Sequence, residues 1–429
     1  MSKLKLTSYE QEMLNGKHGK LKQFAMENIV KYANALGAEE LCVVTKAHCS
    51  GGLRIGGFGQ ADTYEESFRK TYFHDKSSVP IEKICDGCYM QSDVGSCDFV
   101  DWKPMNHSKE RFDKNWDWIH KDVELGMTTM GTCTPYLTGW IPMAGEHFVT
   151  TESSNVLMCN SVFSACGNAD GQEAVMWSAI TGRTPKWGNH IKNNRFGTTV
   201  FNINFPLNTR MDWDILGFAV GSKLKLNAIP VINPVAGMEQ ATIAKLKQFF
   251  ATLATSSGAE MCHIVGVTPE ARTLEEALGN KAAQEVIEIT MDDYQFALDD
   301  FCDKGSADLQ FISMGCPHYT MEELSYVARA LRNRKIHENL KLIIWTNHPT
   351  KEAARLSGYI DWIEEAGGHV LSSGCPVVQG PECYEGVSAL AVDAGKQAHY
   401  MRSSTNAKIF YGSIDDCIEA AITGRWEGK

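Results

Sequence analysis

The segment 308–378 carries the clearest pattern in the chain, because strand-like and helix-like runs alternate through it. Apolar runs typical of buried strands occupy 308–315, 341–346 and 369–374, and amphipathic helical runs separate them. The first of these helices is expected to begin at Thr320, where Thr-Met-Glu-Glu matches a capping box. Such alternation predicts a β-α-β-α-β unit with parallel strands and right-handed crossovers, which is an α/β fold.

Two cysteines stand at equivalent places in this unit. Cys316 follows the first strand in Met-Gly-Cys-Pro-His, and Cys375 follows the third in Ser-Gly-Cys-Pro-Val. The carboxyl ends of parallel strands meet at one edge of a sheet, where open α/β sheets place their ligand sites. A third candidate is Cys133, which lies in the loop-like stretch Gly-Thr-Cys-Thr-Pro-Tyr. Three thiolates from separate loops suit an iron–sulfur cluster, and ordinary buried cysteines in turns are the alternative.

A second group of cysteines competes with the first. Cys85 and Cys88 form a CxxC motif with Cys97 nearby, a pattern typical of zinc, cluster or redox sites. No fourth ligand follows at zinc-ribbon spacing. The glycine-rich stretch 49–60 resembles a phosphate-binding loop, but it lacks the Gly-Lys-Ser/Thr ending. Nucleotide binding there is therefore the weaker hypothesis.

Composition narrows the class of protein. The formal net charge of −11 argues against a nucleic-acid partner and against attachment to anionic lipid. The N-terminus lacks the apolar core of a secretory signal, and no apolar run reaches the ~20 residues that span a bilayer. We therefore expect a cytoplasmic protein without a membrane partner, in which the 14 cysteines do not form a disulfide framework.

Further elements can be predicted from periodicity. The N-terminal residues look helical up to Gly37, a plausible C-cap, and 40–48 is expected to form one buried strand. Strands at 225–233 and 260–267 flank a helix at 240–258. We expect three regions. They are an N-terminal α/β region (1–215) with Cys133, a middle α/β domain (216–306), and a C-terminal β-α-β-α-β domain (307–429) with Cys316 and Cys375.

Several motifs together resemble one known family. The stretch CTPYLTGWIPMAGEHFVTTESSNVLMCNSVFSA (133–165) is similar to the aconitase X signature, and GCPHYTMEEL and GCPVV match its two later cysteine motifs. Lys-Ala-His-Cys-Ser-Gly at 46–51, Lys396, Tyr400 and the ending GSIDDCIEAAITGRW fit the same family. The resemblance spans nearly the whole chain. It implies an aconitase-like fold, with several α/β domains and parallel sheets around a central iron–sulfur site.

The resemblance also implies an activity. Family members are hydro-lyases that dehydrate small hydroxy acids such as cis-3-hydroxy-L-proline or mevalonate 5-phosphate, with an iron–sulfur cluster held by Cys133, Cys316 and Cys375. We expect [4Fe-4S], with [2Fe-2S] and [3Fe-4S] as alternatives, and an open iron acting as Lewis acid. The swivel domain of the superfamily is absent from this sequence, so a small swivel-domain subunit is expected as partner. The alternative function is a non-catalytic or redox metal-binding subunit of a hetero-oligomer.

The family motifs also suggest residues for the reaction. For proton handling, the candidates are Glu146, His147, Glu152 and Ser153. For substrate binding, the candidates are His48, Ser50, Asp93, Ser154, Asn160, Asn168, His318 and Lys396. A structural role is the alternative for each, and the general base could equally lie on the partner subunit.

One segment departs from the family pattern. Residues 165–171 read Ala-Cys-Gly-Asn-Ala-Asp-Gly, where the family has two arginines. Arginine is the natural bidentate partner of carboxylates and phosphates, so its loss points to a different acid group on the substrate, to a smaller substrate, or to replacement from elsewhere. Arg54, Arg183 and Arg195 are the candidates for such replacement. The reaction class is thus better defined than the substrate.

Overall fold

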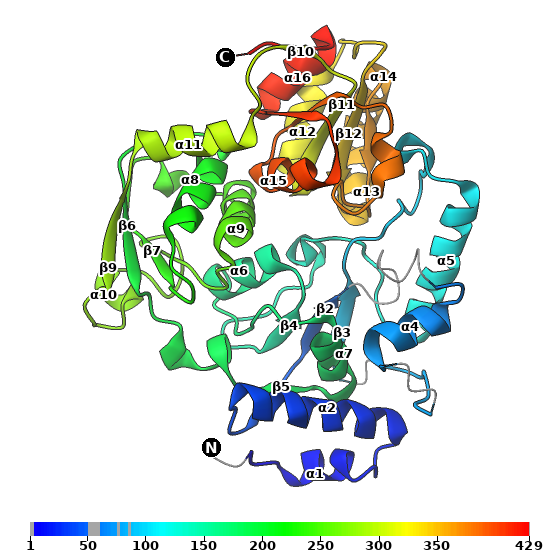
Figure 1. The fold of residues 1–429 in the computed structure, drawn as a ribbon, viewed down its shortest axis with the longest axis vertical. Coiled ribbons are helices and arrows are strands. Elements are labelled where there is room, and N and C mark those ends of the chain that lie inside the picture. Colours follow the sequence, from blue (N-terminus) through cyan, green and yellow to red (C-terminus); the bar gives the residue numbers. More distant parts are fainter. Residues whose placement is uncertain (1–3, 50–60, 75–77, 85–86, 429) are drawn as a thin grey trace.

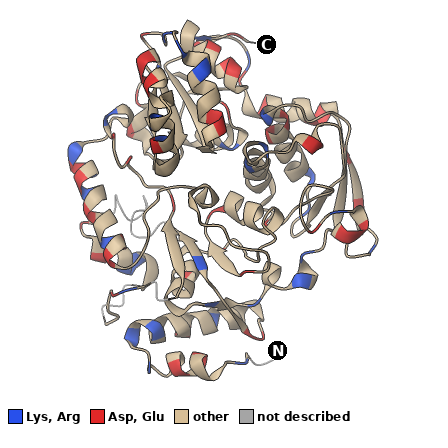
Figure 2. Cartoon of the chain, turned by 180° about the vertical axis from the view of Figure 1, so that it is seen from behind, with Lys and Arg blue, Asp and Glu red and all other residues tan. Residues whose placement is uncertain are grey.

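The computed structural model describes residues 4–49, 61–74, 78–84 and 87–428. Helices and parallel strands alternate along the chain, so the fold is α/β, as expected (Figure 1). Basic and acidic residues are interspersed along helices such as α5 (Lys109–Glu124) (Figure 2). Within the described ranges, no helix is long and apolar enough to cross a bilayer.

The N-terminal region is built on a three-stranded parallel sheet with the order β3-β2-β4. Its strands are β2 (Lys46–Cys49), β3 (Tyr89–Ser92) and β4 (Phe148–Thr150). Besides α5, its helices are α1 (Ser8–Leu14), α2 (Lys20–Leu36), α4 (Tyr64–Tyr72), α6 (Ser153–Ser161) and α7 (Gln172–Thr181). The predicted helical N-terminus is confirmed, and α2 ends at Gly37 in the left-handed conformation.

The single strand expected over 40–48 is wrong. Two strands form instead, because β1 (Leu41–Val43) pairs antiparallel with β5 (Arg183–Pro185) while β2 enters the parallel sheet. Between them, the Val44 amide donates to the Gly182 carbonyl and the Thr45 amide to the His147 carbonyl. The chain therefore crosses from one sheet to the other within two residues.

The middle region has a parallel sheet with the order β8-β7-β6-β9. Its strands are β6 (Thr199–Ile203), β7 (Pro230–Ile232), β8 (His263–Ile264) and β9 (Glu285–Ile289). Its helices are α8 (Arg210–Lys223), α9 (Ile243–Ser257), α10 (Leu274–Ala277) and α11 (Met291–Phe301). The predicted strand–helix–strand unit β7-α9-β8 is confirmed. Because β6 precedes residue 216, this sheet draws on residues from both sides of the boundary expected there.

The C-terminal region has five parallel strands in the order β13-β12-β11-β14-β15. The strands are β11 (Phe311–Tyr319), β12 (Lys341–Thr346), β13 (His369–Leu371), β14 (Ala389–Val392) and β15 (Lys408–Tyr411). The helices are α12 (Met321–Leu331), α13 (His348–Leu356), α14 (Tyr359–Ala366), α15 (Gly395–Ser404) and α16 (Ile414–Thr423). The short strands β10 (Ala307–Asp308) and β16 (Arg425–Trp426) pair antiparallel beside this sheet.

The predicted β-α-β-α-β unit and the capping box at Thr320 are confirmed. Two details differ from expectation. The first strand continues through Cys316 to Tyr319, with an irregular register after Met314, so Cys316 lies within β11 rather than after it. The single helix expected at 351–367 is broken at Gly358, whose left-handed backbone separates α13 from α14.

Candidate active site

The three cysteines of the sequence motifs open onto one pocket, with a volume of about 260 Å³. Its walls come from the N-terminal region and from the C-terminal sheet with α15, two parts that adjoin in Figure 1. The lining residues are Asp93, Val94, Ser96, Cys133, Thr151, Glu152, Ser153, Cys316, Pro317, Cys375, Val377, Val378, Lys396 and Tyr400. Segments far apart in sequence thus assemble one cavity that combines thiols, carboxylates and an ammonium group.

Glycines before two of the cysteines allow close backbone packing. Gly315 has a φ of +99°, and a Cβ added there would lie 2.3 Å from the Trp345 carbonyl oxygen. A Cβ on Gly374 would lie 2.6 Å from Nε2 of Gln379 and 2.8 Å from the Trp345 ring. No real Cβ tolerates such distances, so these positions require glycine. Both backbones therefore close around Trp345 and carry Cys316 and Cys375 to the same cavity.

His318 joins the three cysteine-bearing segments. Its Nε2 donates to the Gly374 carbonyl at 2.7 Å, next to Cys375, and its Nδ1 lies 2.9 Å from the Thr132 hydroxyl, next to Cys133. Because a carbonyl only accepts, Nε2 carries the proton and Nδ1 accepts from Thr132. Burial lowers the pKa of His318 to about 4, so the ring is neutral at physiological pH. The side chain positions the cysteine loops and does not line the pocket.

His48 supports the same loop from the other side. Its Nε2 donates to the Thr132 carbonyl at 2.9 Å, and its Nδ1 lies 3.1 Å from the Thr150 hydroxyl. The Cys375 loop is held as well, because the Ser372 amide donates to the Asp98 carboxylate at 2.6 Å and the Gly95 amide donates to the Ser373 carbonyl at 2.9 Å. Loops from the two regions are therefore joined directly beside the cavity.

A buried ion pair lies in the pocket. Nζ of Lys396, on α15, is 2.7 Å from Oε1 of Glu152, the N-cap residue of α6. Burial alone would lower the pKa of Lys396, but Glu152 and the thiols of Cys316 and Cys133 outweigh it, so its pKa is raised. Burial likewise favours protonated Glu152, but Lys396 and Ser154 reverse this and lower its pKa. Both groups are charged at neutral pH.

The three thiols meet the requirements of a metal cluster. Burial raises the pKa of Cys133 and Cys316 above the usual thiol value and that of Cys375 to about 12, so all three are protonated without metal. Cys133 and Cys316 each lie close enough to another of these thiols for it to raise their pKa further. The three sulfurs are not all within 4.8 Å of one another. A single tetrahedral ion would bring sulfurs to about 3.8 Å, so the spacing fits a larger cofactor better.

Two candidates for proton handling lie away from this pocket. Glu146 pairs with Lys46 at 2.7 Å and accepts from Thr45, and His147 packs against His190. Neither lines the cavity. Both precede β4, whereas Glu152 and Ser153 follow it, so the strand separates them by roughly 10 Å or more.

Of the residues expected to bind substrate, some line or support the pocket and others lie away from it. Asp93 and Lys396 line the pocket. Ser154 donates to Glu152 at 2.8 Å, so it supports a pocket residue. Asn160 bonds the Gly167 backbone, and Asn168 bonds the Trp187 carbonyl and the Asn189 amide, so both have structural partners elsewhere. Ser50 lies outside the described residues.

The competing sites receive less support. Cys85 and residues 50–60, including Arg54, lie outside the described residues. Cys88 and Cys97 are buried, and neither belongs to a group of three or more metal-ligating side chains within the described residues. Arg183 pairs with Glu10. Arg195 pairs with Glu270 and contacts backbone carbonyls, so neither arginine faces the pocket.

Several contributors were not predicted. Thr132 and Asp98 act through backbone and side-chain hydrogen bonds to the cysteine loops, and Thr151 and Ser96 line the cavity. Thr132, Thr151 and Ser96 lie within a few residues of predicted ones, which is the signal that could have found them. Asp98 also stands beside a candidate, Cys97, but its role depends on Ser372, which is distant in sequence.

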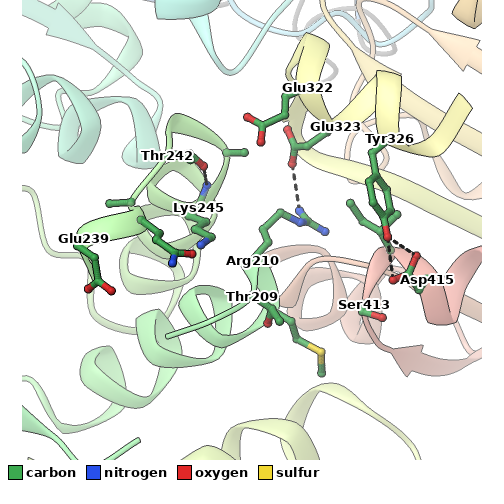
Figure 3. A pocket seen from close by; sticks show the side chains of 15 residues that line it. Thr209, Arg210, Glu239, Thr242, Lys245, Glu322, Glu323, Tyr326, Ser413 and Asp415 are labelled. Atoms are coloured by element: carbon green, nitrogen blue, oxygen red, sulfur yellow. Dashed lines mark hydrogen bonds and ion pairs between the residues drawn. The ribbon is translucent and has the colours of Figure 1, made fainter. Parts of the chain in front are cut away.

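A larger cavity of about 680 Å³ lies between α8, α9, α12 and α16. Figure 3 shows that two of its polar groups already have partners, since Arg210 points to Glu323 and the Tyr326 hydroxyl to Asp415. It contains no thiol and no histidine. The smaller cavity with the three cysteines is therefore the better candidate for chemistry.

Comparisons with known proteins identify the family of the chain. Family models described as the first, second and third domains of aconitase X match residues 3–193, 197–299 and 309–423. A phosphomevalonate dehydratase large subunit from Methanothermobacter thermautotrophicus is 30% identical over 402 residues, covering 94% of this chain and 94% of that protein. A cis-3-hydroxy-L-proline dehydratase from Hypocrea jecorina is 28% identical over 438 residues, covering 99% of this chain and 70% of that protein.

The fold agrees as well. The crystal structure of Thermococcus kodakaraensis aconitase X in its holo form matches with a TM-score of 0.82 at 25% identity, covering 97% of this chain and 100% of that one. The relatives are dehydratases, and dehydratases are hydro-lyases. The chain is therefore an enzyme of the hydro-lyase class, and it belongs to the aconitase X family.

Proposed function

We propose that this hydro-lyase dehydrates a small hydroxy acid with an iron–sulfur cluster held by Cys133, Cys316 and Cys375. The observation that carries the proposal is the convergence of these thiols with the Lys396–Glu152 ion pair on one 260 Å³ pocket. When bound, a cluster with an open iron supplies a Lewis acid that weakens the bond to the leaving hydroxyl. Among the cluster types, [4Fe-4S] best suits three protein ligands with one iron left open.

Side chains of the pocket supply the remaining functions. The Lys396 ammonium offers charge-assisted hydrogen bonds to the acid group of the substrate. Glu152 is ionised beside it, so its carboxylate is able to accept the proton from the carbon next to the leaving group. Ser153 follows Glu152 at the start of α6 and lines the same wall, where its hydroxyl and amide orient the substrate.

The substrate follows from the size and charge of the site. A cavity of about 260 Å³ suits a small molecule, and one lysine suits a single carboxylate better than a phosphorylated acid. The relatives act on cis-3-hydroxy-L-proline or phosphomevalonate according to their names. The smaller of these, a hydroxyproline-like acid, is the better match to this pocket. Three described lining residues, Asp93, Glu152 and Ser153, also offer partners for a substrate ammonium.

A second subunit completes the proposal. Similar proteins are named as large subunits, which implies a small partner. We propose that this chain also works with a small swivel-type subunit, which covers the pocket and contributes a further proton acceptor. We place the complex in the cytoplasm, where free thiols stay reduced.

The test compares two lysines in similar ion pairs. Lys396 and Lys46 each lie 2.7 Å from a glutamate, but only Lys396 lines the pocket. The enzyme is reconstituted anaerobically with iron, sulfide and the small subunit, and dehydration is followed on a panel of hydroxy acids. Lys396→Met should lower kcat/KM on the order of 100-fold or more with iron content unchanged. Lys46→Met should retain activity.

Two results would reject the proposal. One is a reconstituted protein that binds no iron and sulfide and dehydrates no acid in the panel. The other is an equal loss of kcat/KM in both lysine variants, because that would show a general effect of breaking an ion pair rather than a role in the pocket.

A further inference from the structure

A second group of potential metal ligands lies outside the active-site pocket. The side-chain ligand atoms of Cys42, His147 and His190 all lie within 4.8 Å of one another. Cys42 is on β1, His147 directly precedes β4, and His190 ends the 3₁₀ turn Gly188–His190. None of the three lines the pocket of Cys133. The group therefore joins three segments with no role in the proposed dehydration.

The hydrogen bonds of these side chains are incomplete. Nδ1 of His147 and Nδ1 of His190 are 3.0 Å apart, and the Cys42 thiol donates weakly to the Thr184 carbonyl at 3.7 Å. The His190 ring has a backbone contact with Cys166, but its Nε2 has no hydrogen bond of normal geometry in the described part of the chain, and the residue is only 3% exposed. A buried ring nitrogen without a partner is costly, so an unpaired one in this group points to a missing ligand.

The protonation states suit a metal cation. Burial lowers the pKa of His147, and burial with the neighbouring His147 and Arg195 lowers that of His190 to about 3. Both imidazoles are thus neutral, which is the form that binds metals. The nearby cations are compensated, because Arg195 pairs with Glu270 and Lys186 pairs with Glu40.

Burial also raises the pKa of Cys42 to about 12, with Cys166 and Asp170 adding to the effect. Its thiol would therefore lose its proton only when a metal binds. The reaction is balanced by release of that proton to solvent as the metal–sulfur bond forms.

We propose that Cys42, His147 and His190 bind one divalent ion of the zinc type. Two imidazoles and one thiolate form a donor set that Zn²⁺ prefers. His147 is half-buried, so solvent has a path to the site and supplies the fourth ligand. The ion ties the β1–β5 ribbon and the Gly188–His190 turn to the edge of the parallel sheet at β4.

Cobalt provides a direct test, because Co²⁺ reports thiolate ligation through its visible and near-ultraviolet absorption. The full chain is used with Cys133, Cys316 and Cys375 changed to serine, so that the active-site pocket adds no thiolate signal. One equivalent of Co²⁺ should give tetrahedral d–d bands and a thiolate-to-cobalt charge-transfer band, and Zn²⁺ should displace it. Binding should release one proton per metal, detected with a pH indicator.

Variants in the same background separate this site from others. Cys42→Ser should abolish the charge-transfer band, and His190→Gln should weaken Co²⁺ binding about tenfold or more, because loss of a ligand costs at least as much as loss of a supporting group. Cys302→Ser, a half-buried thiol at the end of α11, should change nothing. A charge-transfer band that persists in Cys42→Ser, or its absence from the parent, would overturn the proposal. The readout is spectroscopic, so it is independent of dehydratase activity.

Discussion

Single side chains decide how the cysteine loops are held. His318 is the main one, because its two ring nitrogens bond residues adjacent to Cys133 and Cys375 while its backbone lies two residues after Cys316. We expect His318→Leu to destabilise the protein by about 1–3 kcal/mol, since it leaves the buried Gly374 carbonyl without its partner and removes one hydrogen bond of the Thr132 hydroxyl. It should also reduce the iron retained after reconstitution. Urea unfolding and iron analysis measure the two effects.

The control for this variant is His120→Leu, a change at an exposed histidine on α5. It should alter neither stability nor iron content. Full iron retention in His318→Leu would contradict the positioning role.

The buried carboxyl group of Asp170 should make the stability of the protein depend on pH. This carboxyl group accepts from the Tyr32 hydroxyl at 2.8 Å, and burial raises its pKa to about 7. The unfolded value is about 3.9, so the folded state binds more protons between about pH 4 and 7, and stability falls as pH rises through that window. Asp170→Asn should remove this loss and stabilise the protein at pH 8 by at most about 4 kcal/mol.

At pH 4 the same variant should differ little from the parent, since Asp170 is then protonated in the folded state and about half protonated in the unfolded state, which changes the free energy of unfolding by only about 0.5 kcal/mol. Asp361→Asn, on the exposed face of α14, serves as the control and should leave the pH dependence unchanged. The test is to measure the melting temperatures of the parent and both variants at pH 4 and at pH 8. A parallel shift at pH 4 and pH 8 would count against a protonation effect.

The limits of sequence reasoning are clearest among the site residues. Cys316 and Cys375 could be predicted to converge because each stands in a Gly-Cys-Pro motif near the end of a parallel strand. Glu146 and Glu152 looked equivalent because they are close in sequence, but β4 runs between them and carries them to opposite ends of a strand. Asp98 could not be predicted, because its role depends on a tertiary contact with Ser372.

Among elements, β11 depends on one backbone conformation. Gly315 adopts a positive φ within this strand, next to the Trp345 carbonyl. We expect Gly315→Ala to destabilise the protein by about 3 kcal/mol or more, because strain and a backbone clash add together. Gly258→Ala is the matched control, since Gly258 also has a positive φ but no atom within 4 Å of an added Cβ. It should cost about 1–2 kcal/mol, as measured by urea unfolding.

Equal losses in the two variants would show that the Trp345 contact adds nothing beyond the backbone strain. An intact Gly315→Ala protein with normal iron binding would show that the Cys316 segment adjusts freely.

The ends of several strands and helices could not be predicted from the hydrophobic pattern of the sequence. The runs at 40–48 and 351–367 each looked like one element, because the hydrophobic pattern of a sequence does not show where the backbone changes direction. In the first, backbone hydrogen bonds to Gly182 and His147 divide the run between two sheets. In the second, Gly358 ends α13 in the left-handed conformation. The parallel order of β11, β12 and β13 was predictable because alternating strands and helices leave few topologies. The flanking strands β14 and β15 carried no comparable signal.

At the scale of the whole molecule, a buried ion network connects the middle region to the C-terminal sheet. Arg210 on α8 forms an ion pair with Asp393, after β14. It forms a second with Glu323 on α12 (Figure 3). Arg210→Met should cost about 3–5 kcal/mol, because it leaves the buried Asp393 carboxylate without its cation. Arg334→Met removes an exposed pair with Glu419 and should cost at most about 1 kcal/mol.

Urea unfolding of both variants measures this difference. A cost of Arg210→Met no larger than that of Arg334→Met would show that the network contributes little to holding the regions together. The three-region organisation itself is a proposal, in which each parallel sheet with its helices forms one folding unit and the buried Arg210 network fixes two of them in place.

The walls of the active-site pocket come from both ends of the chain, and this has a consequence for the order of events in the cell. Cys133 leaves the ribosome long before Cys375 and Lys396, and His318 can join the three cysteine segments only when all of them are present. During synthesis, Cys133 is therefore a solitary thiol with no site around it. The proposed cofactor must be delivered after translation has passed Lys396.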